Sequence, residues 1–429
     1  MTSHTTPRTA GDPTSAPAAP TTAIPSLAEF EDAAVALSDV VVRTPFDVSE
    51  HLSDVLGAPV HLKLENLQRT GSFKIRGATY RLSRLTAEER ARGVVAASAG
   101  NHAQGVALAA QKLGIAATIF MPLGVPVPKL LATRGYGAEV ILEGATVETP
   151  LRLAAEFAER TGAVLIHPFD HRDVIIGQGT LGLELWDAVP DLDTVVVGIG
   201  GGGLIAGVAA AVKARAAAEG RTVRVVGVQA ENSAAYPSSL AAGEPLTVAT
   251  TPTIADGIAV ARPGDLPFEV ISTLVDEVVT VSDDDIARAL LILLERAKQV
   301  VEPAGAVGVA AILAGKVQAS GPTAVILSGG NIDPLLLQRV VAHGLAASGR
   351  YMTLQIPLPD RPGQLARVSE LLSIAGANVT EVLHTRHGQG MQISEVILQL
   401  SVETRGEEHR AHVIGVLEEA GFHPRVVRD

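Results

Sequence analysis

The chain has 429 residues, more than one compact core usually contains, so two or three structural units are expected. Hydrophobic residues make up 47% of the chain and charged residues 19%, and the formal charge of −12 argues against a nucleic-acid or anionic-membrane surface, which would need a basic patch. There are no cysteines, which excludes disulfides, thiolate metal sites and cysteine nucleophiles and fits a cytoplasmic enzyme.

The first 25 residues are rich in Thr, Pro and Ala and lack the apolar run of a signal peptide, so we expect a disordered tail over 1–25. The longest apolar runs, at 194–208 and 306–314, are too short and too interrupted by glycine to cross a membrane. Ser26 and Glu29 are spaced like a capping pair, which predicts a helix that continues to Leu37.

Strand-like and helix-like segments then alternate along the chain. Strands are expected at residues 60–64, 93–97, 117–121, 138–142, 164–166, 193–198, 223–228 and 323–327, and helices at 103–113, 127–134, 147–160 and 204–218. Most of these strands are apolar runs with little alternation, which is typical of parallel strands covered by helices on both faces. The sequence therefore predicts an α/β unit with parallel sheets over residues 26–346.

The pattern changes near residue 347. Strands are expected at 351–356, 378–384, 391–402 and 422–427, helices at 363–375 and 407–420, and a turn at 387–390. This βαββαβ order is the ferredoxin-like split motif. We therefore expect a second unit over residues 347–429.

The first segment that suggests chemistry is Gly71-Ser72-Phe73-Lys74-Ile75-Arg76-Gly77-Ala78, just before an expected helix. A lysine beside an aromatic residue suits a Schiff-base amine, because the ring of Phe73 can lie against a flat cofactor. A surface lysine is the commoner explanation for a single such residue. This segment alone is therefore weak evidence for a cofactor site.

The second segment, residues 97–105, joins the end of a strand to the start of a helix, where ligands of open α/β sheets bind. Backbone amides there, together with Ser98 and Asn101, could hold a carboxylate. An ordinary helix-capping turn is the alternative.

The third segment is Gly198-Ile199-Gly200-Gly201-Gly202-Gly203-Leu204, between a strand and a helix. Glycines allow successive backbone N–H groups to approach phosphate oxygens, and the helix dipole favours the negative charge. Five glycines among these seven residues cost conformational entropy on folding, which argues against a merely flexible turn. The same run also fits G-x-G-x-x-G, with Glu231 beyond the next strand, so a dinucleotide site is a rival interpretation.

The fourth segment, Ser328-Gly329-Gly330-Asn331, follows the strand at 323–327. The Ser328 hydroxyl could reach a ring nitrogen of a cofactor. Taken alone, this segment is better explained as a plain glycine turn.

In this order the four segments resemble the fold-type II pyridoxal-phosphate enzymes, and most closely the threonine ammonia-lyases, over residues 27–345. Asp256-Gly257 and residues 302–306 also look like family segments. The resemblance implies that Lys74 carries pyridoxal 5'-phosphate as a Schiff base and acts as the catalytic base. It further assigns the other site residues as follows: Phe73 packs on the ring, Asn101 bonds the ring hydroxyl, Ser328 meets the pyridine nitrogen, Gly200, Gly201, Gly202, Gly203 and Leu204 hold the phosphate, and Ser98, Ala99, Gly100, Asn101 and His102 take the substrate carboxylate.

The implied reaction is β-elimination of L-threonine to 2-oxobutanoate and ammonia, and of L-serine to pyruvate. A hydroxyl on the ring nitrogen keeps that nitrogen unprotonated, which suits elimination over transamination. An L-serine dehydratase or a threonine synthase of the same fold is the nearest alternative. An NAD-dependent dehydrogenase would leave Lys74 and Ser328 unexplained, and the intact Lys74 argues against a non-catalytic amino-acid sensor.

Two departures from related enzymes bear on this expectation. Related serine racemases carry a serine where this chain has Ala99, so racemisation is not expected. Those relatives also hold a divalent ion just after the strand that ends near Val228, where residues 229–235 of this chain are short of acidic ligands. We therefore expect no divalent metal, while a monovalent cation on backbone oxygens remains open.

The C-terminal unit resembles the ACT domain, a small amino-acid-binding regulatory module. The resemblance rests on Asp360-Arg361-Pro362-Gly363-Gln364-Leu365 and on Gly376-Ala377-Asn378-Val379. It implies a site near Asp360, Gly363 and Asn378, formed across a pair of such domains in a homo-oligomer, a dimer or tetramer. Isoleucine or valine is the expected effector for an enzyme of isoleucine biosynthesis, and a mere dimerisation domain is the alternative.

Overall fold

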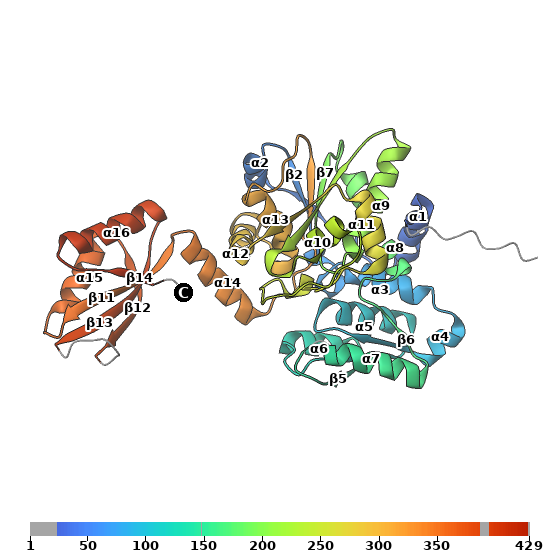
Figure 1. Cartoon of the computed structure of the whole chain (residues 1–429), viewed down its shortest axis with the longest axis horizontal. Helices are drawn as coiled ribbons and strands as arrows, with labels where there is room; N and C mark the ends of the chain where they lie inside the picture. The colour runs from blue at the N-terminus through green and yellow to red at the C-terminus, as the bar shows by residue number, and fades with distance from the viewer. Residues whose placement is uncertain (1–23, 147, 387–393, 428–429) are drawn as a thin grey trace, which may run out of the picture.

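The computed structural model describes residues 24–146, 148–386 and 394–427. The tail expected over 1–25 lies almost entirely outside the described residues, and the turn expected at 387–390 lies wholly outside them. Figure 1 shows two α/β units packed against each other and a third unit beyond the orange helix α14 (Pro334–Ala347).

The larger α/β unit is built on a six-stranded sheet. Its order is β1 (Phe46–Val48), β2 (Val60–Lys63), β10 (Thr323–Ile326), β7 (Thr194–Gly198), β8 (Arg224–Ala230) and β9 (Glu277–Val281). Only the short β1 runs antiparallel to its neighbour. Within β7, Val195 and Val197 pack into one hydrophobic core and Val196 into the core on the opposite face, since successive side chains alternate. Helices therefore cover both faces of this sheet, as the unbroken apolar strands predict.

The helices of the larger unit divide between these two cores. One core is formed with α1 (Leu27–Leu37), α8 (Arg172–Ala188), α9 (Gly203–Ala218) and α11 (Asp265–Leu274), and the other with α2 (Glu50–Leu56), α12 (Asp283–Ile292) and α13 (Pro303–Leu313). The remaining short elements are α10 (Ala235–Ala242), single 3-10 turns at Glu65–Leu67, Arg69–Gly71, Glu231–Ser233 and Asp256–Ile258, and a π-helical turn at Leu293–Ala297. The expected capping pair is present, because the Ser26 N–H donates to the Glu29 carboxylate at 2.8 Å.

The smaller α/β unit contains a four-stranded parallel sheet. Its order is β5 (Glu139–Leu142), β4 (Ala117–Met121), β3 (Val94–Ala97) and β6 (Val164–Leu165). One face is covered by α3 (Lys74–Ser83), α5 (Asn101–Leu113) and α6 (Val127–Gly135), the other by α7 (Glu148–Thr161), and α4 (Ala87–Arg92) precedes β3. Because α3 packs against both α5 and α8, it joins the two α/β units.

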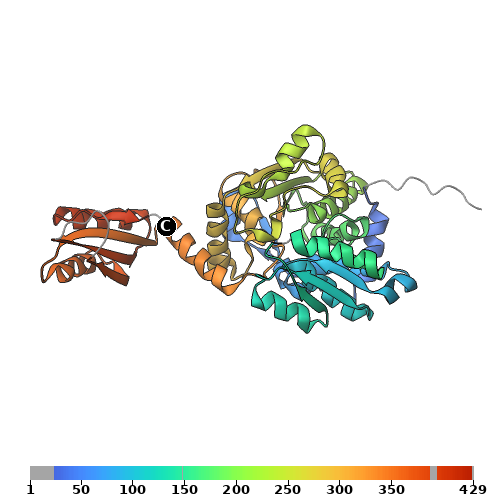
Figure 2. The ribbon, with the colours of Figure 1, turned by 60° about the horizontal axis from the view of Figure 1, so that its bottom comes forward.

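The C-terminal unit has an antiparallel sheet of order β12 (Asn378–Thr385), β13 (Glu395–Glu403), β11 (Tyr351–Pro359) and β14 (Arg425–Val427). Its core lies between this sheet and the helices α15 (Gln364–Ile374) and α16 (Glu407–Glu419). The chain thus follows the expected βαββαβ order. Figure 2 shows this unit standing apart from the α/β units at the far end of α14.

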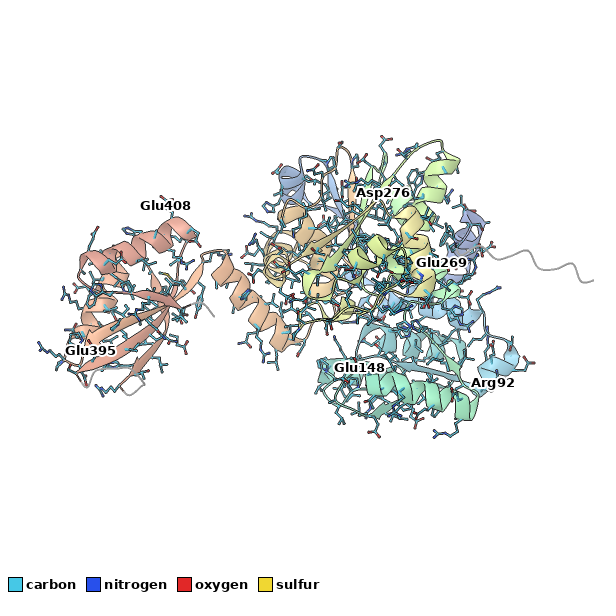
Figure 3. The ribbon with its side chains drawn as sticks, in the orientation of Figure 1. Arg92, Glu148, Glu269, Asp276, Glu395 and Glu408 are labelled. Atoms are coloured by element: carbon cyan, nitrogen blue, oxygen red, sulfur yellow. The ribbon has the colours of Figure 1, made fainter. Side chains whose placement is uncertain are left out.

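Charged side chains lie on the outer surface of all three units. Arg92, Glu148 and Glu408 lie exposed on three different helices or helix ends, as Figure 3 shows. Within the described parts of the chain, no helix is both long enough and apolar enough to span a bilayer.

Helix α3 is fixed in the interior by a buried cluster of charges. The Arg76 guanidinium donates to both oxygens of Glu65, at 2.8 and 2.9 Å, and to Glu184 Oε1 at 2.7 Å. Lys63 Nζ donates to Glu184 Oε2 at 2.6 Å and to the Thr44 carbonyl at 2.7 Å. Burial alone would lower the pKa of Arg76, but the two carboxylates raise it above its usual value, so the guanidinium stays charged.

Arg76→Met should reduce the free energy of unfolding of the α/β part by about 3–5 kcal/mol, because it leaves the buried Glu65 carboxylate without its ion-pair partner and with only the Thr44 hydroxyl as a donor. Urea unfolding followed by far-UV circular dichroism measures this loss. The matched control is Arg152→Met, which removes an exposed ion pair with Glu156 and should cost less than about 1 kcal/mol. Equal losses in the two variants would contradict the role given to the buried cluster.

Candidate active site

Lys74 is the first residue of α3 and lies at the junction of the two α/β units. Its Nζ donates to the Pro168 carbonyl at 3.0 Å and lies 5.1 Å from the centroid of the Phe73 ring. Burial lowers the pKa of the amine to about 8, while the Glu302 carboxylate opposes this shift. A lysine with a lowered pKa is more often in the unprotonated form that attacks a carbonyl.

The segment before Lys74 pairs with the segment that contains Ser328. The Phe73 N–H donates to the Ser328 carbonyl at 3.1 Å, the Gly330 N–H donates to the Gly71 carbonyl at 2.8 Å, and Ser72 and Gly329 form an antiparallel bridge. Two sequence segments that are far apart in the chain therefore meet beside the lysine. The Ser72 hydroxyl is buried there and finds no hydrogen-bond partner among the described residues.

The glycine run forms the turn between β7 and α9. Gly202 has φ +100°, which an L side chain rarely adopts, and a Cβ on Gly201 would lie 2.4 Å from the Phe169 ring. The Gly201 carbonyl accepts hydrogen bonds from Tyr236 Oη and from the Gly264 N–H. The N–H groups of residues 200–204, in contrast, donate to no acceptor within the described chain. Unpaired amides at a helix N-terminus form a cradle for an anion such as a phosphate.

The loop from Ser98 to His102 lies between β3 and α5. The Ser98 hydroxyl accepts from the Gly100 N–H at 3.1 Å, while the N–H groups of Asn101 and His102 donate to no described residue. The ring of His102 is buried and its Nε2 bonds the Ile166 carbonyl at 2.8 Å. Burial lowers the pKa of His102 to about 3, so the ring is neutral. This ring is engaged in the fold, which leaves the backbone N–H of His102 for a ligand.

Asn101 is held by two other side chains. Its Nδ2 donates to Glu302 Oε1 at 2.6 Å, and its Oδ1 accepts from Asn331 Nδ2 at 2.8 Å. Asn331 also donates to the Thr70 carbonyl at 2.7 Å. A Cβ on Gly329 would lie 2.2 Å from Glu302 Oε1, so this glycine leaves the space that the carboxyl group occupies.

Glu302 was not assigned a role from the sequence, although its segment is part of the resemblance. It is almost fully buried at the N-cap of α13, and burial raises the pKa of its carboxyl group to about 7. Lys129 lowers this pKa and Asp256 raises it, so both of these charges act within the site. No local sequence pattern marks Glu302 or Lys129, because only the folded chain brings Glu302 to Asn101 and Lys129 to Gly100.

The arrangement suits a flat cofactor with an aldehyde and a phosphate group. Lys74 provides an amine of lowered pKa, and residues 200–204 provide free amides. Ser328 provides a buried hydroxyl, and its backbone carbonyl bonds the Phe73 N–H beside Lys74. The Ser72 hydroxyl, which has no hydrogen-bond partner among the described residues, is a further buried polar group in this segment. In the parts of the chain that the structure describes, no group of three or more His, Asp or Glu side chains could hold a metal ion.

The residues expected in the regulatory site lie at two ends of the C-terminal sheet. Asp360 and Gly363 follow β11 at the end where Pro359 pairs with Glu395. Asn378 begins β12 at the opposite end, where it pairs with Glu403 and donates to its carboxylate at 3.1 Å. Asp360 and Asn378 of one chain therefore do not face each other, and a site that contains both requires a second copy of the unit.

Residues 37–329 match the family described as pyridoxal-phosphate dependent enzyme, and residues 352–422 match the ACT domain. An L-threonine ammonia-lyase of Thermotoga maritima is 47% identical over 403 residues, which cover 94% of this chain and 99% of that protein. The L-threonine dehydratase catabolic TdcB of Escherichia coli is 46% identical over 300 residues, covering 69% of this chain and 90% of that protein.

The solved structure of the processed form of threonine deaminase isoform 2 from Solanum lycopersicum is similar in fold, with a TM-score of 0.69 and 38% identity. The similarity covers 74% of this chain and 93% of that chain. These matches give no support to the dinucleotide-binding alternative for the glycine run. They confirm the fold-type II architecture and the cofactor that the sequence predicts. The chain therefore belongs to the family of pyridoxal-phosphate-dependent enzymes and carries an ACT domain near its C-terminus.

Proposed function

We propose that this enzyme deaminates L-threonine to 2-oxobutanoate and ammonia, and L-serine to pyruvate in the same way. The observation that carries the proposal is Lys74, an amine of lowered pKa whose Nζ bonds the Pro168 carbonyl, next to the Phe169 ring that the glycine turn contacts. The similarity to an L-threonine ammonia-lyase over 94% of the chain supports the substrate.

The chain's own groups would hold the cofactor at four points. Lys74 would bind its aldehyde carbon, the free amides of residues 200–204 its phosphate, Asn101 its ring hydroxyl and Ser328 its ring nitrogen. The network through Glu302 and Asn331 fixes the Asn101 amide, so that its direction is set before the cofactor arrives. Phe73, whose ring centroid lies 5.1 Å from Lys74 Nζ, would pack on the cofactor ring.

When bound, pyridoxal phosphate supplies a conjugated ring that stabilises the negative charge left on the substrate Cα. Lys74 would take the Cα proton on its Nζ, which an amine with a pKa of about 8 can do near neutral pH. The N–H groups of Asn101 and His102 would bind the substrate carboxylate. Ala99 offers no acid or base on the loop, which favours elimination over racemisation.

We further propose that the C-terminal unit, from about residue 347, binds an amino-acid effector such as isoleucine or valine between two copies of the chain. The ACT match supports an amino-acid ligand, and the separation of Asp360 from Asn378 within one chain supports a shared site. We also propose that the enzyme is a homo-oligomer, either a dimer or a tetramer, and that it is located in the cytoplasm.

Lys74→Ala should reduce threonine turnover by at least about a thousandfold and remove the yellow absorbance of the bound cofactor, because one amine serves as anchor and base. Release of 2-oxobutanoate and the absorbance spectrum measure the two effects. The exposed lysine Lys112 on α5 is the control, and Lys112→Ala should change neither. A Lys74→Ala enzyme with a tenth or more of the normal activity would rule out this assignment.

The rate at which apoenzyme captures pyridoxal phosphate should rise about tenfold per pH unit below pH 8 and level off above it, because only the neutral Lys74 amine attacks the aldehyde. The pKa values of His102 and His167 are lowered by burial, so neither ring titrates near pH 8, and the Glu302 carboxyl group, with a pKa of about 7, is mostly ionised there. Stopped-flow absorbance follows the capture.

Glu302→Gln should move this inflection to lower pH. The Glu302 carboxylate raises the pKa of Lys74, so its replacement by a neutral amide should lower that pKa. An inflection that stays in place would show that Glu302 does not act on Lys74.

A chain that ends at Gly349 should keep threonine turnover and lose its response to isoleucine and valine. The TdcB relative aligns with only 69% of this chain over 90% of its own length, which supports a core that works without the last unit. Coupling between sites is usually about 1–3 kcal/mol, so the full chain should show a change of roughly fivefold to 150-fold in half-saturating threonine. A full-length enzyme that ignores every amino acid, with a truncated one that loses its oligomeric state, would make this unit an assembly domain.

A further inference from the structure

We infer that Lys129 on α6 is the residue that recognises the negative charge of the amino-acid substrate, by binding its α-carboxylate at the Ser98–His102 loop. This inference rests on the proposed function and deepens it, since it adds a charged group to a loop that otherwise offers only neutral donors.

The first observation is the position of the Lys129 ammonium. A Cβ built on Gly100, in the middle of the loop, would lie 3.4 Å from Lys129 Nζ. The ammonium thus lies beside the loop in which the N–H groups of Asn101 and His102 have no described acceptor. It is also close enough to Glu302 to lower the pKa of that carboxyl group.

The second observation is that Lys129 lacks hydrogen bonds although it is mostly buried. Its side chain is only 11% exposed, and its one ion pair is a contact of 3.6 Å with Asp256 Oδ2, too long for a hydrogen bond. Across the described chain, no acceptor lies within hydrogen-bond distance of Nζ. An ammonium group has three donors, and a buried charge without hydrogen bonds is costly. The Lys129 ammonium therefore has hydrogen-bond donors available for an anionic ligand.

Asp256 is a weak partner that a ligand can replace. Its side chain is 61% exposed, so water solvates its carboxylate in the absence of Lys129. Asp256 lies on the turn Asp256–Ile258 of the larger unit, whereas α6 belongs to the smaller unit. We infer that the substrate carboxylate takes over the ammonium from Asp256 as it binds.

The α-carboxylate fits this position better than the other anion in the reaction, the cofactor phosphate. The free amides suited to a phosphate belong to residues 200–204, after β7 of the larger unit. Lys129 instead faces Gly100, after β3 of the smaller unit. Replacing Lys129 should therefore weaken amino-acid binding and leave cofactor binding unchanged.

The test uses the full-length holoenzyme and two ligands that have no β-hydroxyl to lose, L-alanine and its neutral amide, L-alaninamide. Binding is followed from the change in cofactor absorbance. Lys129→Met should raise the Kd of L-alanine about 10- to 100-fold, the usual range for one charge-assisted hydrogen bond, and leave the Kd of L-alaninamide unchanged. Lys129→Arg should restore most of the preference for the carboxylate, and the exposed Lys112→Met should leave it intact.

Asp256→Asn separates a ligand-binding role from a structural one. If Lys129 binds the carboxylate, this variant keeps the preference for L-alanine over its amide. If it loses the preference as Lys129→Met does, the ion pair merely holds the loop in place and the inference is overturned. Equal ratios of the two Kd values in wild type and Lys129→Met overturn it as well. Because neither ligand is turned over, these results are independent of whether L-threonine proves to be the substrate.

Discussion

The guanidinium of Arg76 is surrounded in the interior by the carboxylates of Glu65 and Glu184, and this burial of charge fixes the place of α3. Glu65 follows β2 of the larger unit and Glu184 lies on α8, so Arg76 connects the helix to two separate elements. Removing a buried charge from water is costly unless its partners are well placed. The helix therefore has one position in which this cluster is satisfied, and Lys74 begins that helix.

Close backbone contacts make the same position possible. A Cβ on Gly105 of α5 would lie 3.1 Å from the carbonyl carbon of Lys74, and a Cβ on Gly177 of α8 would lie 2.7 Å from Gly77 Cα. Glycine at these helical positions costs roughly 1 kcal/mol in helix propensity relative to alanine. Here it lets α5 and α8 approach α3 from the two α/β units. The reactive amine is thus set between units whose sheets are otherwise separate.

The fold and much of the site could be predicted because they follow from local patterns. Apolar strand runs, the glycine turn before α9 and the loop before α5 are all visible within a few residues. The positions of Glu302 and Lys129 beside these segments could not be predicted, because only tertiary packing brings them to Asn101 and Gly100. The ring of His102 shows the converse: its segment marks the site, yet its side chain bonds Ile166 in the core.

The lack of a side chain at Gly329 makes the segment around Gly329 and the segment around Glu302 depend on each other. The carboxyl group of Glu302 fills the volume that a Cβ at 329 would need, and the same carboxyl group sets the direction of the Asn101 amide. A methyl group at 329 would clash with this carboxyl group at 2.2 Å and would also lie 3.2 Å from Asn101 Nδ2, so it would disturb both the carboxyl group and the amide that it holds. A side chain at 329 therefore requires a smaller group at 302, and a redesign of this part of the molecule has to treat the two positions together.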